Sequence, residues 1–482
     1  MKRLYFMGIC GTAMGNAALM ARQLGYEVCG SDSAVYPPMS ELLAHSGIKV
    51  FEGYDPERLE RLVPDCVVVG NVVSRGHPEV EWLLRTRKFP YTSLPALLHD
   101  LFLRERQSIV ISGTHGKTTT TCLTAFLFKA QGRDPGYLIG GVPRDLPTGA
   151  HSGAMGAPFV IEGDEYDSAF FDKRSKFIHY APDILVMNNL EFDHADIFRD
   201  LEDVKRTFRH LLRLVPDNGF VLVNGEDPNI AELLPISWTR VLRVGTGPDN
   251  DLRITDFHES REGIRFVLNW QGQLWTEVRM CLGGAYNARN AAMAALAVGL
   301  ALNPEDPTQI SLAALGDFQG VKRRQEMLHE KDDLVVIEDF GHHPTAIRYT
   351  LDSLRLRYPD YTITACFEPR SNTARTRIFQ REFTEALREA DAVFIAPVNR
   401  MTSLSCEQRL DTIRMARDLS EAGLKAHASE SSIQLLDAVV EACKEAKGCR
   451  QLFCFFSNGS FDGIMRAFLE RVCLIPSFKR NV

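Results

Sequence analysis

One segment between residues 107 and 130 constrains the fold of this chain more than any other. An apolar run at residues 107–112 has the length of a buried strand, and a glycine-containing loop and a helix-forming segment follow it. Four apolar residues of that segment are spaced to fall on one face of a helix: Leu123, Phe126, Leu127 and Ala130. A strand, a tight loop and a helix in this order form the repeating unit of parallel α/β sheets. We therefore expect an α/β fold whose main sheet is parallel.

The loop of this segment has the composition of an anion-binding site. It consists of Gly113, Thr114, His115, Gly116, Lys117, Thr118 and Thr119. Glycines let backbone N–H groups approach phosphates at a helix N-terminus, where the helix dipole favours negative charge. Lys117 can reach the β- and γ-phosphates, and the Thr118 hydroxyl can bind Mg²⁺. The general phosphate-loop pattern has its first glycine where Ile111 stands, and here Gly113 lies inside the loop instead. The loop predicts a nucleoside triphosphate site; a glycine turn with an incidental lysine is the alternative.

The length and rhythm of the chain predict three domains. Its 482 residues, divided by the roughly 150 of an average domain, give about three. Short apolar runs alternate with polar helical stretches from the start of the chain, again from residue 107 and again from residue 334. Residues 240–280 alternate apolar and polar positions instead, as half-buried antiparallel strands do. We place the domains at residues 1–106, 107–326 and 327–482, with hinges near residues 104–107 and 324–331, where apolar residues are few.

Charge and cysteine usage exclude several classes of protein. The 55 Lys and Arg against 62 Asp and Glu give a net charge of −7, so nucleic acid and anionic membranes are poor default partners. Eleven cysteines without a Cys-x-x-Cys pair indicate the reduced thiols of a cytoplasmic protein, not disulfides or a zinc site. Residues 4–21 carry no charge and could form a signal peptide or a short membrane span. Gly8, Gly11 and Gly15 interrupt this stretch, which favours a strand entering a glycine turn.

Polar clusters follow two further apolar runs of the central segment. Residues 162–167 follow the run at 159–161, and residues 188–194 follow the run at 184–187. The carboxyl ends of parallel strands meet at one edge of a sheet, where ligands of open α/β folds collect. Carboxylates and an imidazole beside a triphosphate are suitable ligands for a second hard cation. Alone, each cluster would be a solvated acidic loop or a capping histidine, whereas beside the phosphate loop they favour a metal site.

A second glycine turn lies near the start of the chain. Gly8, Gly11, Thr12 and Gly15 follow a predicted strand, and their spacing differs from the dinucleotide pattern Gly-x-Gly-x-x-Gly. A pyrophosphate at this helix N-terminus, with the Asp32 carboxylate holding a ribose, fits the arrangement. An NAD-dependent oxidoreductase is the obvious rival. Two phosphate-binding turns, one of them suited to a γ-phosphate and Mg²⁺, favour one nucleotide as fuel and another as a handle on the substrate.

Together these motifs resemble those of the Mur ligases, the ATP-dependent amide-forming enzymes of peptidoglycan synthesis. The resemblance covers nearly the whole chain and rests on the Gly8 turn, residues 113–119, Glu165, Asp193, His194, residues 287–290, Arg323, Arg324 and residues 339–345. It implies a Rossmann-like N-terminal domain for a UDP-sugar. It also implies a central ATPase-like domain with a mainly parallel sheet and a small antiparallel sheet, and a Rossmann-like C-terminal domain that closes over the site.

The resemblance also implies roles for individual residues. Lys117 and Thr118 would handle the phosphates and a first Mg²⁺, Glu165 and His194 would ligate or position a second, and Arg324 would contact the γ-phosphate. The remaining nucleotide contacts would be Asn290, Asp339 and His343. The UDP-sugar contacts would be Gly8, Gly11, Thr12, Gly15, Ser31, Asp32 and Asn71. Two positions are left unassigned: Tyr286, where relatives often have an adenine-binding histidine, and Lys205, the nearest match to a lysine that some relatives carbamylate.

Within the family, residues 339–345 are similar to the branch that uses UDP-N-acetylmuramate. Residues 36–40, 170–177, 188–198 and 368–373 resemble members that join L-alanyl-γ-D-glutamyl-meso-diaminopimelate to that sugar nucleotide in cell-wall recycling. Members that add free L-alanine share almost every nucleotide motif and are the nearest alternative. A nucleotide-switched binding protein that catalyses no ligation is an alternative of another class. The resemblance implies ATP and Mg²⁺ as cofactors, small-molecule substrates, and a monomer or weak homodimer.

Four residues after the strand expected at residues 362–367 are the predicted contacts of the peptide substrate. They are Glu368, Arg370, Ser371 and Asn372. The planar guanidinium of Arg370 suits a peptide carboxylate, and Ser371 and Asn372 could receive polar ends. The alternative is a structural salt bridge of Arg370, since charged residues after strands are often only solvated.

Overall fold

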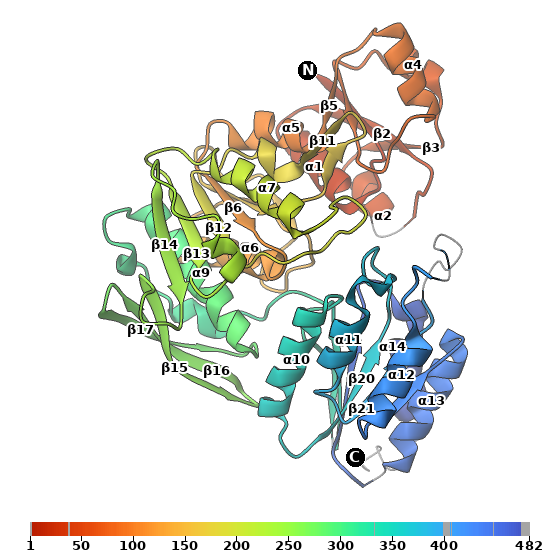
Figure 1. Ribbon diagram of the computed structural model, residues 1–482. Helices are drawn as coiled ribbons and strands as arrows, with labels where there is room; N and C mark the ends of the chain where they lie inside the picture. The colour runs from red at the N-terminus through yellow and green to blue at the C-terminus, as the bar shows by residue number, and fades with distance from the viewer. Residues whose placement is uncertain are drawn as a thin grey trace.

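The computed structural model describes residues 2–36, 39–331, 333–398, 405, 407–446 and 448–473. Within these ranges the chain forms three α/β units in sequence order, each built on its own main sheet (Figure 1). The expected three-domain α/β class is confirmed. Pro37 and Pro38, in the segment at residues 36–40, lie outside the described residues.

The N-terminal unit is a parallel sheet of five strands in the order β3-β2-β1-β4-β5. Its strands are β1 (Arg3–Met7), β2 (Glu27–Asp32), β3 (Lys49–Glu52), β4 (Cys66–Val69) and β5 (Tyr91–Ser93). Its helices are α1 (Thr12–Gln23), α2 (Met39–His45), α3 (Pro56–Leu62), α4 (Pro78–Thr86), α5 (Leu94–Leu98) and the π-helix η1 (His99–Leu103). The uncharged stretch at residues 4–21 divides into β1, a turn and α1, as its glycines predict. Among the described helices, none combines the length and the apolar character needed to cross a bilayer.

Ten strands form the sheet of the central unit, in the order β17-β16-β15-β14-β13-β12-β6-β9-β7-β8. They are β6 (Ser108–Ser112), β7 (Gly136–Leu138), β8 (Ala150–His151), β9 (Phe159–Gly163), β12 (Ile184–Met187), β13 (Phe220–Asn224), β14 (Arg240–Gly245), β15 (Leu252–Ser260), β16 (Gly263–Trp270) and β17 (Gln273–Met280). A separate hairpin pairs β10 (Asp167–Ala169) with β11 (Asp172–Ser175). The helices are α6 (Lys117–Ala130), α7 (Leu201–Leu212), α8 (Pro228–Ala231), α9 (Ala285–Leu302) and the short 3-10 helices η2 (Lys176–His179), η3 (Pro307–Gln309) and η4 (Ala313–Asp317).

Two details of the central unit differ from the prediction. Strand β14 pairs in parallel with both β13 and β15, so the antiparallel strands begin only at β15, and they extend the main sheet. Alternating burial along a strand shows that one face of its sheet is exposed. The pattern is the same whether the neighbouring strands run parallel or antiparallel, so it could not predict the direction of β14. Helix α6 is buried well beyond one face, with Thr118 to Thr121 inside and Ala130 exposed, because it contacts both the sheet and α9.

The C-terminal unit has six strands in the order β18-β19-β23-β20-β21-β22, and only β18 runs antiparallel to its neighbour. The strands are β18 (Glu326–Lys331), β19 (Leu334–Asp339), β20 (Thr362–Phe367), β21 (Ala392–Ile395), β22 (Lys425–Ala428) and β23 (Gln451–Phe456). The helices are α10 (Pro344–Arg357), α11 (Gln380–Leu387), α12 (Thr412–Glu421), α13 (Ser432–Glu445), α14 (Ile464–Cys473), η5 (Arg377–Phe379) and η7 (Phe461–Gly463). The edge strand β22 was not predicted, because it is short and only half-buried.

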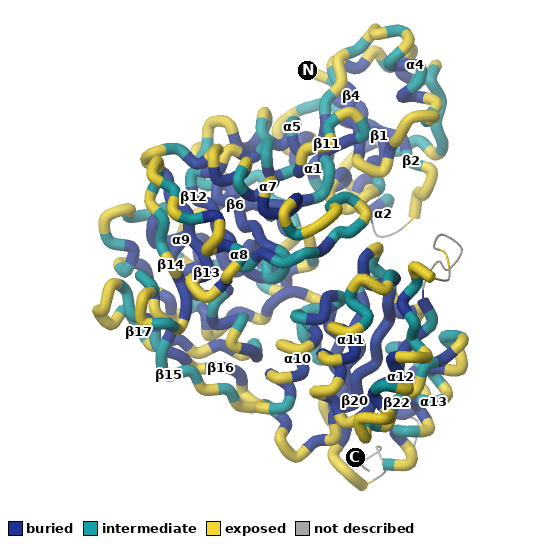
Figure 2. The backbone as a smooth tube through the Cα atoms, viewed as in Figure 1, coloured by how far each residue is buried: buried dark blue, intermediate teal, exposed yellow. Residues whose placement is uncertain are grey.

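The first two units share one apolar core. A single cluster of buried side chains contains Leu97 and Phe102 from the first unit and Phe159 and Phe177 from the second. Figure 2 shows the strands and inner helices of this region buried and the connecting loops exposed. The reason for expecting a hinge at residues 104–107 was a lack of apolar residues that join the neighbouring cores. That expectation is wrong, because apolar side chains of both units form one core there.

Polar contacts connect the C-terminal unit to the central one, while its own apolar clusters lie within it. On β15 of the central sheet, the Glu259 carboxylate accepts a hydrogen bond of 2.5 Å from the Ser353 hydroxyl on α10. The same oxygen of Glu259 accepts a bond of 2.8 Å from the backbone N–H of Gly284, just before α9. One carboxylate thus links three elements of two units.

Candidate active site

The phosphate loop connects β6 to α6 with the geometry that its glycines allow. Gly113 and Gly116 have φ values of +127° and +81°, a region that residues with side chains rarely adopt. A Cβ atom on Gly113 would lie 2.9 Å from the carbonyl oxygen of Asn189. Thr118 and Thr119 lie in the first turn of α6 and are buried. The predicted strand, loop and helix are therefore present, and the loop packs against the segment after β12.

Replacing Gly116 with alanine should weaken ATP binding. The added Cβ would lie 2.7 Å from Oδ1 of Asn290, and a side chain in this left-handed conformation costs about 1–2 kcal/mol. Because the clash displaces the loop, we expect Gly116→Ala to bind ATP roughly tenfold more weakly, equivalent to about 1.4 kcal/mol, as measured by calorimetry. Gly132→Ala is the matched control, since Gly132 has φ +72° and no atom within 4 Å of an added Cβ. Equal ATP affinities of the two variants would contradict this role of Gly116.

The structure brings together Lys117, Glu165 and His194, three residues that the sequence placed at the site. The Lys117 ammonium donates to the Gly113 carbonyl at 2.6 Å and lies 2.9 and 3.0 Å from the two oxygens of Glu165. Nε2 of His194 lies 2.9 Å from Oε1 of Glu165. Burial disfavours the ammonium, but the Glu165 charge outweighs it and raises the pKa of Lys117. Burial opposes ionisation of Glu165 as well, yet Lys117 and His194 lower its pKa, so the pair is charged.

A second carboxylate, the half-buried Glu162, lies beside the first turn of α6. The Thr118 hydroxyl donates to Oε2 of Glu162 at 3.2 Å. Burial raises the pKa of Glu162, and its largest opposing contribution is a hydrogen bond from the Gly140 backbone. Glu162 belongs to the acidic cluster at residues 162–167, but no individual role was predicted for it. The signal was its position at the end of β9, next to β6 in the sheet.

The residues predicted for the nucleotide surround the loop from two units. The amide oxygen of Asn290 lies beside Gly116, and its amide nitrogen donates to Asn287 at 3.0 Å. The Arg324 guanidinium lies over the Phe340 ring, 4.5 Å from its centre. Burial lowers the pKa of Arg324, and the nearby carboxylates Asp339 and Glu162 oppose this effect.

Asp339 and Tyr286 lie at the junction of these two units. The Asp339 carboxylate accepts from the backbone N–H of Gln325 at 2.8 Å and of Gly341 at 2.7 Å. The amide of Gln325 donates to the Tyr286 hydroxyl at 2.5 Å. Tyr286 stands where relatives often have an adenine-binding histidine. It contacts Gln325, just before β18 of the C-terminal unit, close to Asp339.

The side chains of His115 and His343 converge on Glu191. Nε2 of His115 lies 3.0 Å from Oε2 of Glu191, and Nδ1 of His343 lies 3.3 Å from the same oxygen. The Thr114 hydroxyl accepts a bond of 2.8 Å from the backbone N–H of Glu191. The sequence predicted both histidines as nucleotide contacts and assigned nothing to Glu191. The one sequence feature that pointed to Glu191 was its place in the polar cluster at residues 188–194.

The N-terminal glycine turn is formed as predicted. The backbone N–H of Gly8 donates to the Ser31 carbonyl at 2.8 Å, and the Asp32 carboxylate accepts from the Cys10 backbone at 2.9 Å. The buried Ser31 hydroxyl points away from this turn and donates to Glu79 at 2.7 Å. Three of the other predicted sugar contacts belong to the same turn and helix: Gly11 and Thr12 begin α1, and Gly15 packs against Met39. Asn71 follows β4 and is exposed.

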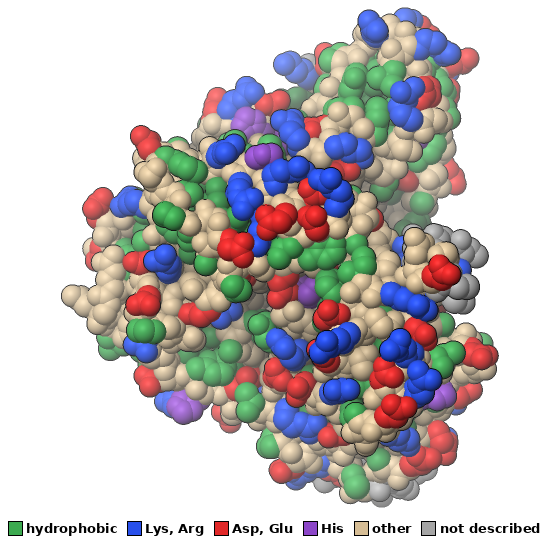
Figure 3. Space-filling view, in the orientation of Figure 1, with side chains coloured by type: hydrophobic (Ala, Val, Ile, Leu, Met, Phe, Trp, Pro, Cys, Tyr) green, Lys and Arg blue, Asp and Glu red, His purple; other side chains and the backbone are tan. Residues whose placement is uncertain are grey.

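The predicted peptide segment follows β20 and faces the loop that carries His194. Nη1 of Arg370 lies 3.2 Å from Glu368 and 3.8 Å from Asp462. The Ser371 hydroxyl accepts from the backbone of Ala374 at 3.0 Å. Figure 3 shows acidic and histidine side chains in the hollow between the central and C-terminal units.

Lys205 pairs with carboxylates instead of taking part in the site. Its ammonium lies 2.7 Å from Glu232 and 3.2 Å from Glu202, and the hydrogen bond to Glu232 raises its pKa. This environment favours the charged ammonium and not a carbamate.

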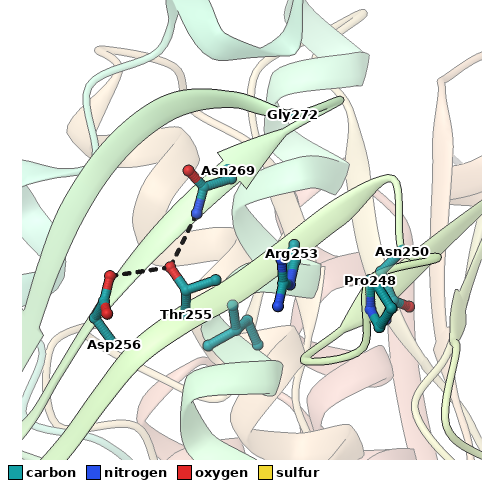
Figure 4. A pocket seen from close by; sticks show the side chains of 8 residues that line it. Pro248, Asn250, Arg253, Thr255, Asp256, Asn269 and Gly272 are labelled. Atoms are coloured by element: carbon teal, nitrogen blue, oxygen red, sulfur yellow. Dashed lines mark hydrogen bonds between the residues drawn. The ribbon is translucent and has the colours of Figure 1, made fainter.

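The cavity drawn in Figure 4 lies elsewhere in the central unit. It has a volume of about 650 Å³ and is lined by Pro248, Asn250, Arg253, Ile254, Thr255, Asp256, Asn269 and Gly272. The Thr255 hydroxyl lies 3.0 Å from the amide of Asn269 and 3.3 Å from the carboxylate of Asp256. None of the lining residues belongs to the predicted site, so cavity volume does not locate the chemistry.

Comparisons with known proteins agree with this arrangement of motifs. Residues 3–106 match the Mur ligase family, catalytic domain; residues 111–298 match the Mur ligase middle domain; and residues 323–459 match the Mur ligase, glutamate ligase domain. An Escherichia coli protein named UDP-N-acetylmuramate--L-alanyl-gamma-D-glutamyl-meso-2,6-diaminoheptandioate ligase is 40% identical over 97% of this chain and 98% of its own length. A Desulforapulum autotrophicum UDP-N-acetylmuramate--L-alanine ligase is 31% identical over 88% of this chain and 89% of its own.

A solved structure gives the same result for the fold. The murein peptide ligase of Psychrobacter arcticus superposes with a TM-score of 0.68 at 32% identity, covering 98% of this chain and 99% of that one. The match extends through all three units, and the sequence matches include the phosphate loop, the glycine turn and the peptide segment. The chain therefore belongs to the Mur ligase family.

Proposed function

We propose that this protein joins L-alanyl-γ-D-glutamyl-meso-diaminopimelate to UDP-N-acetylmuramate at the expense of ATP, in cell-wall recycling. The observation that carries the proposal is the contact between the phosphate site and the peptide segment. Asp196, two residues after His194, accepts a hydrogen bond of 2.8 Å from Asn372. The Ala195 backbone N–H donates to the Thr373 hydroxyl at 3.1 Å. A peptide held by this segment would lie beside the phosphate site, and the name of the 40% identical relative supports the same substrates.

The chemistry requires activation of the carboxylate. The lactyl carboxylate of the sugar nucleotide attacks the γ-phosphorus, and the bond to ADP breaks, which yields an acyl phosphate. The neutral α-amine of the peptide then attacks the carbonyl carbon, phosphate leaves and the nitrogen loses a proton. Both steps concentrate negative charge, which Lys117 and Arg324 are placed to stabilise. In this scheme residues 1–106 bind the sugar nucleotide, residues 107–326 bind ATP, and residues 327–482 bind the peptide.

The donor set fits Mg²⁺. Thr118 and Glu165 are buried and Glu162 is half-buried, and all three present oxygen atoms near the loop. Mg²⁺ prefers oxygen ligands from one or two carboxylates together with phosphates. Thr118 would hold a first Mg²⁺, and Glu165 and His194 would ligate or position a second. Bound Mg²⁺ neutralises charge on the transferring phosphoryl group.

A coupled assay of ADP release tests the proposal. The purified protein is supplied with ATP, Mg²⁺ and UDP-N-acetylmuramate, together with either the tripeptide or free L-alanine. We expect tripeptide-dependent ADP release and a product whose mass equals the two substrates minus water. Faster turnover with L-alanine would favour the alternative activity, which the 31% identical relative carries in its name.

Hydroxylamine distinguishes a ligase from a nucleotide-switched binding protein. An acyl phosphate reacts with hydroxylamine to give a hydroxamate, so the ligase should form this product from the sugar nucleotide and ATP without a peptide. A switch protein would hydrolyse ATP and form no hydroxamate.

Replacing Arg370 separates peptide binding from ATP binding. About a third of the Arg370 side chain is exposed, although it pairs with Glu368, so its guanidinium remains available to a peptide carboxylate. We expect Arg370→Ala to raise the KM for the tripeptide about tenfold or more, since a charge-assisted hydrogen bond is worth about 1.5–3 kcal/mol. The KM for ATP should change little. Arg381→Ala, which removes an exposed arginine paired within α11, is the control. Equal changes in both KM values would favour a purely structural Arg370.

We also propose a cytoplasmic enzyme that acts on small molecules as a monomer or weak homodimer. Among the described residues, Cys29, Cys122 and Cys366 are free thiols, as a reducing compartment would keep them. The net charge of −7 gives no reason to expect a nucleic acid partner. Sedimentation at several protein concentrations would measure the oligomeric state.

A further inference from the structure

Glu191, to which the ligase chemistry above assigns no role, forms a cluster with the predicted nucleotide contacts His115 and His343. Their ligand atoms, two imidazole nitrogens and one carboxylate oxygen, all lie within 4.8 Å of one another. His115 belongs to the phosphate loop and Glu191 to the segment after β12, whereas His343 caps α10 in the C-terminal unit. The cluster therefore spans the contact between two units.

The spacing of these atoms suits a transition metal ion. Ligands bound to one Zn²⁺ at about 2.0–2.1 Å in a tetrahedron lie about 3.3 Å apart. The carboxylate oxygen lies 3.0 Å from His115 and 3.3 Å from His343. Two imidazoles and a carboxylate are a ligand set of zinc that leaves a fourth position for water. The side chain of Glu191 is 31% exposed, so an ion can enter from solvent.

The hydrogen bonds of His343 leave a lone pair facing this oxygen. Nε2 of His343 lies 3.2 Å from the Phe192 carbonyl, which can accept only if that nitrogen carries the proton. Nδ1 then carries the one lone pair of the ring, which accepts a long bond of 3.3 Å from the Thr345 backbone and lies 3.3 Å from Oε2 of Glu191. A metal ion at Nδ1 would replace this long bond. A backbone carbonyl that orients the second nitrogen is the usual support of a metal-binding histidine. The Nδ1 lone pair of His343 and the Glu191 carboxylate are both hydrogen-bond acceptors, so they repel each other. A cation bound between them would remove this repulsion.

The protonation states agree with this geometry. Burial, together with the neighbouring His115, lowers the pKa of His343 to about 4. Burial opposes ionisation of Glu191, but the interactions with His115 and His343 bring its pKa to about 2. At neutral pH the carboxylate is ionised and His343 is neutral, as metal ligands must be.

We infer that His115, Glu191 and His343 form a binding site for a transition metal ion such as Zn²⁺ or Co²⁺, which links the phosphate loop to the C-terminal unit. This site is separate from the two proposed Mg²⁺ positions, at Thr118 and at Glu165 with His194. Imidazole ligands favour zinc and cobalt over Mg²⁺. Because the ligands come from two units, a bound ion would hold those units together.

Cobalt titration of the full-length, metal-free protein tests the site. With excess Mg²⁺ present, we expect one Co²⁺ per chain, visible as d–d absorption without a sulfur-to-metal charge-transfer band. Such a band would indicate the exposed thiols of Cys281 or Cys449 instead. His115→Ala, Glu191→Gln and His343→Asn should each weaken Co²⁺ binding by about 100-fold or more, since even second-shell changes cost about 10–100-fold.

Controls separate this site from its neighbours. His343→Asn retains a side chain that caps a helix well, so α10 should remain folded, which circular dichroism verifies. His194→Ala removes the imidazole of the proposed Mg²⁺ position, and His151→Ala removes an imidazole that pairs with Asp134 at the surface. Both should bind Co²⁺ as the parent protein does. Absence of one bound Co²⁺ in the parent, or unchanged binding in His115→Ala and His343→Asn, would overturn the inference.

Discussion

Lys117→Met should lower kcat by about 100-fold or more, because loss of one electrostatic donor at a developing charge costs this much. In the structure the Lys117 ammonium is held between the Gly113 carbonyl and Glu165, at the start of α6. Bound phosphates would compete with Glu165 for this cation. Methionine preserves the length and packing of the side chain but removes its charge. Initial rates of ADP release at saturating substrates measure the effect.

Stability has to be separated from catalysis in this experiment. Removal of one partner from a buried ion pair destabilises a protein by about 3–5 kcal/mol, because the other charge remains buried. Activity should therefore be compared well below the melting temperature of the variant. Lys129→Met removes an exposed lysine from the last turn of the same helix and should leave the rate unchanged. A Lys117→Met enzyme of normal rate would exclude the phosphate role.

Glu165→Gln should lower the rate about 100-fold and increase the Mg²⁺ concentration needed for half of the maximal rate. Among the described residues, Glu165 is the carboxylate that contacts both Lys117 and His194, so its charge organises both neighbours. Glutamine keeps the shape and one oxygen but is a weaker ligand for a hard cation. Rates measured over a range of Mg²⁺ concentrations separate the two effects.

Two comparisons make the Mg²⁺ result specific. Glu202→Gln changes a carboxylate that is 65% exposed and pairs with Lys205, so its Mg²⁺ dependence should match that of the parent. If Glu165→Gln lowered kcat while the Mg²⁺ dependence stayed the same, Glu165 would act only by orienting Lys117 and His194.

The sequence predicts the parts of this molecule that depend on local chemistry. The strand, glycines and helix of the phosphate loop are contiguous, so periodicity and φ preferences specify them directly. Glu165 and His194 come together because each follows a parallel strand, and such strands present their carboxyl ends at one edge. Their distance could be expected without knowing how the units pack.

Contacts between units were not predictable in the same way. The convergence of His115 and His343 on Glu191 depends on the placement of α10 relative to the central sheet, which no local pattern encodes. Strand β14 was assigned the wrong direction, because alternating burial is the same in parallel and antiparallel edge regions. The shared core around Phe102 was missed because the charged residues that follow it in sequence concealed its apolar packing.

The hydrogen bonds of Glu259 would stay in place during nucleotide exchange if the C-terminal unit rotated about this carboxylate. It ties α10 to the residue before α9, on the far side of the central sheet from the shared core with the N-terminal unit. If the C-terminal unit rotates about this carboxylate, Thr373 moves away from Ala195 while the beginning of α9 and Asn290 stay in position. Asp339 and His343 belong to the C-terminal unit and would move with Thr373. The predicted nucleotide contacts on the two units would then separate, and ADP could leave through the opening.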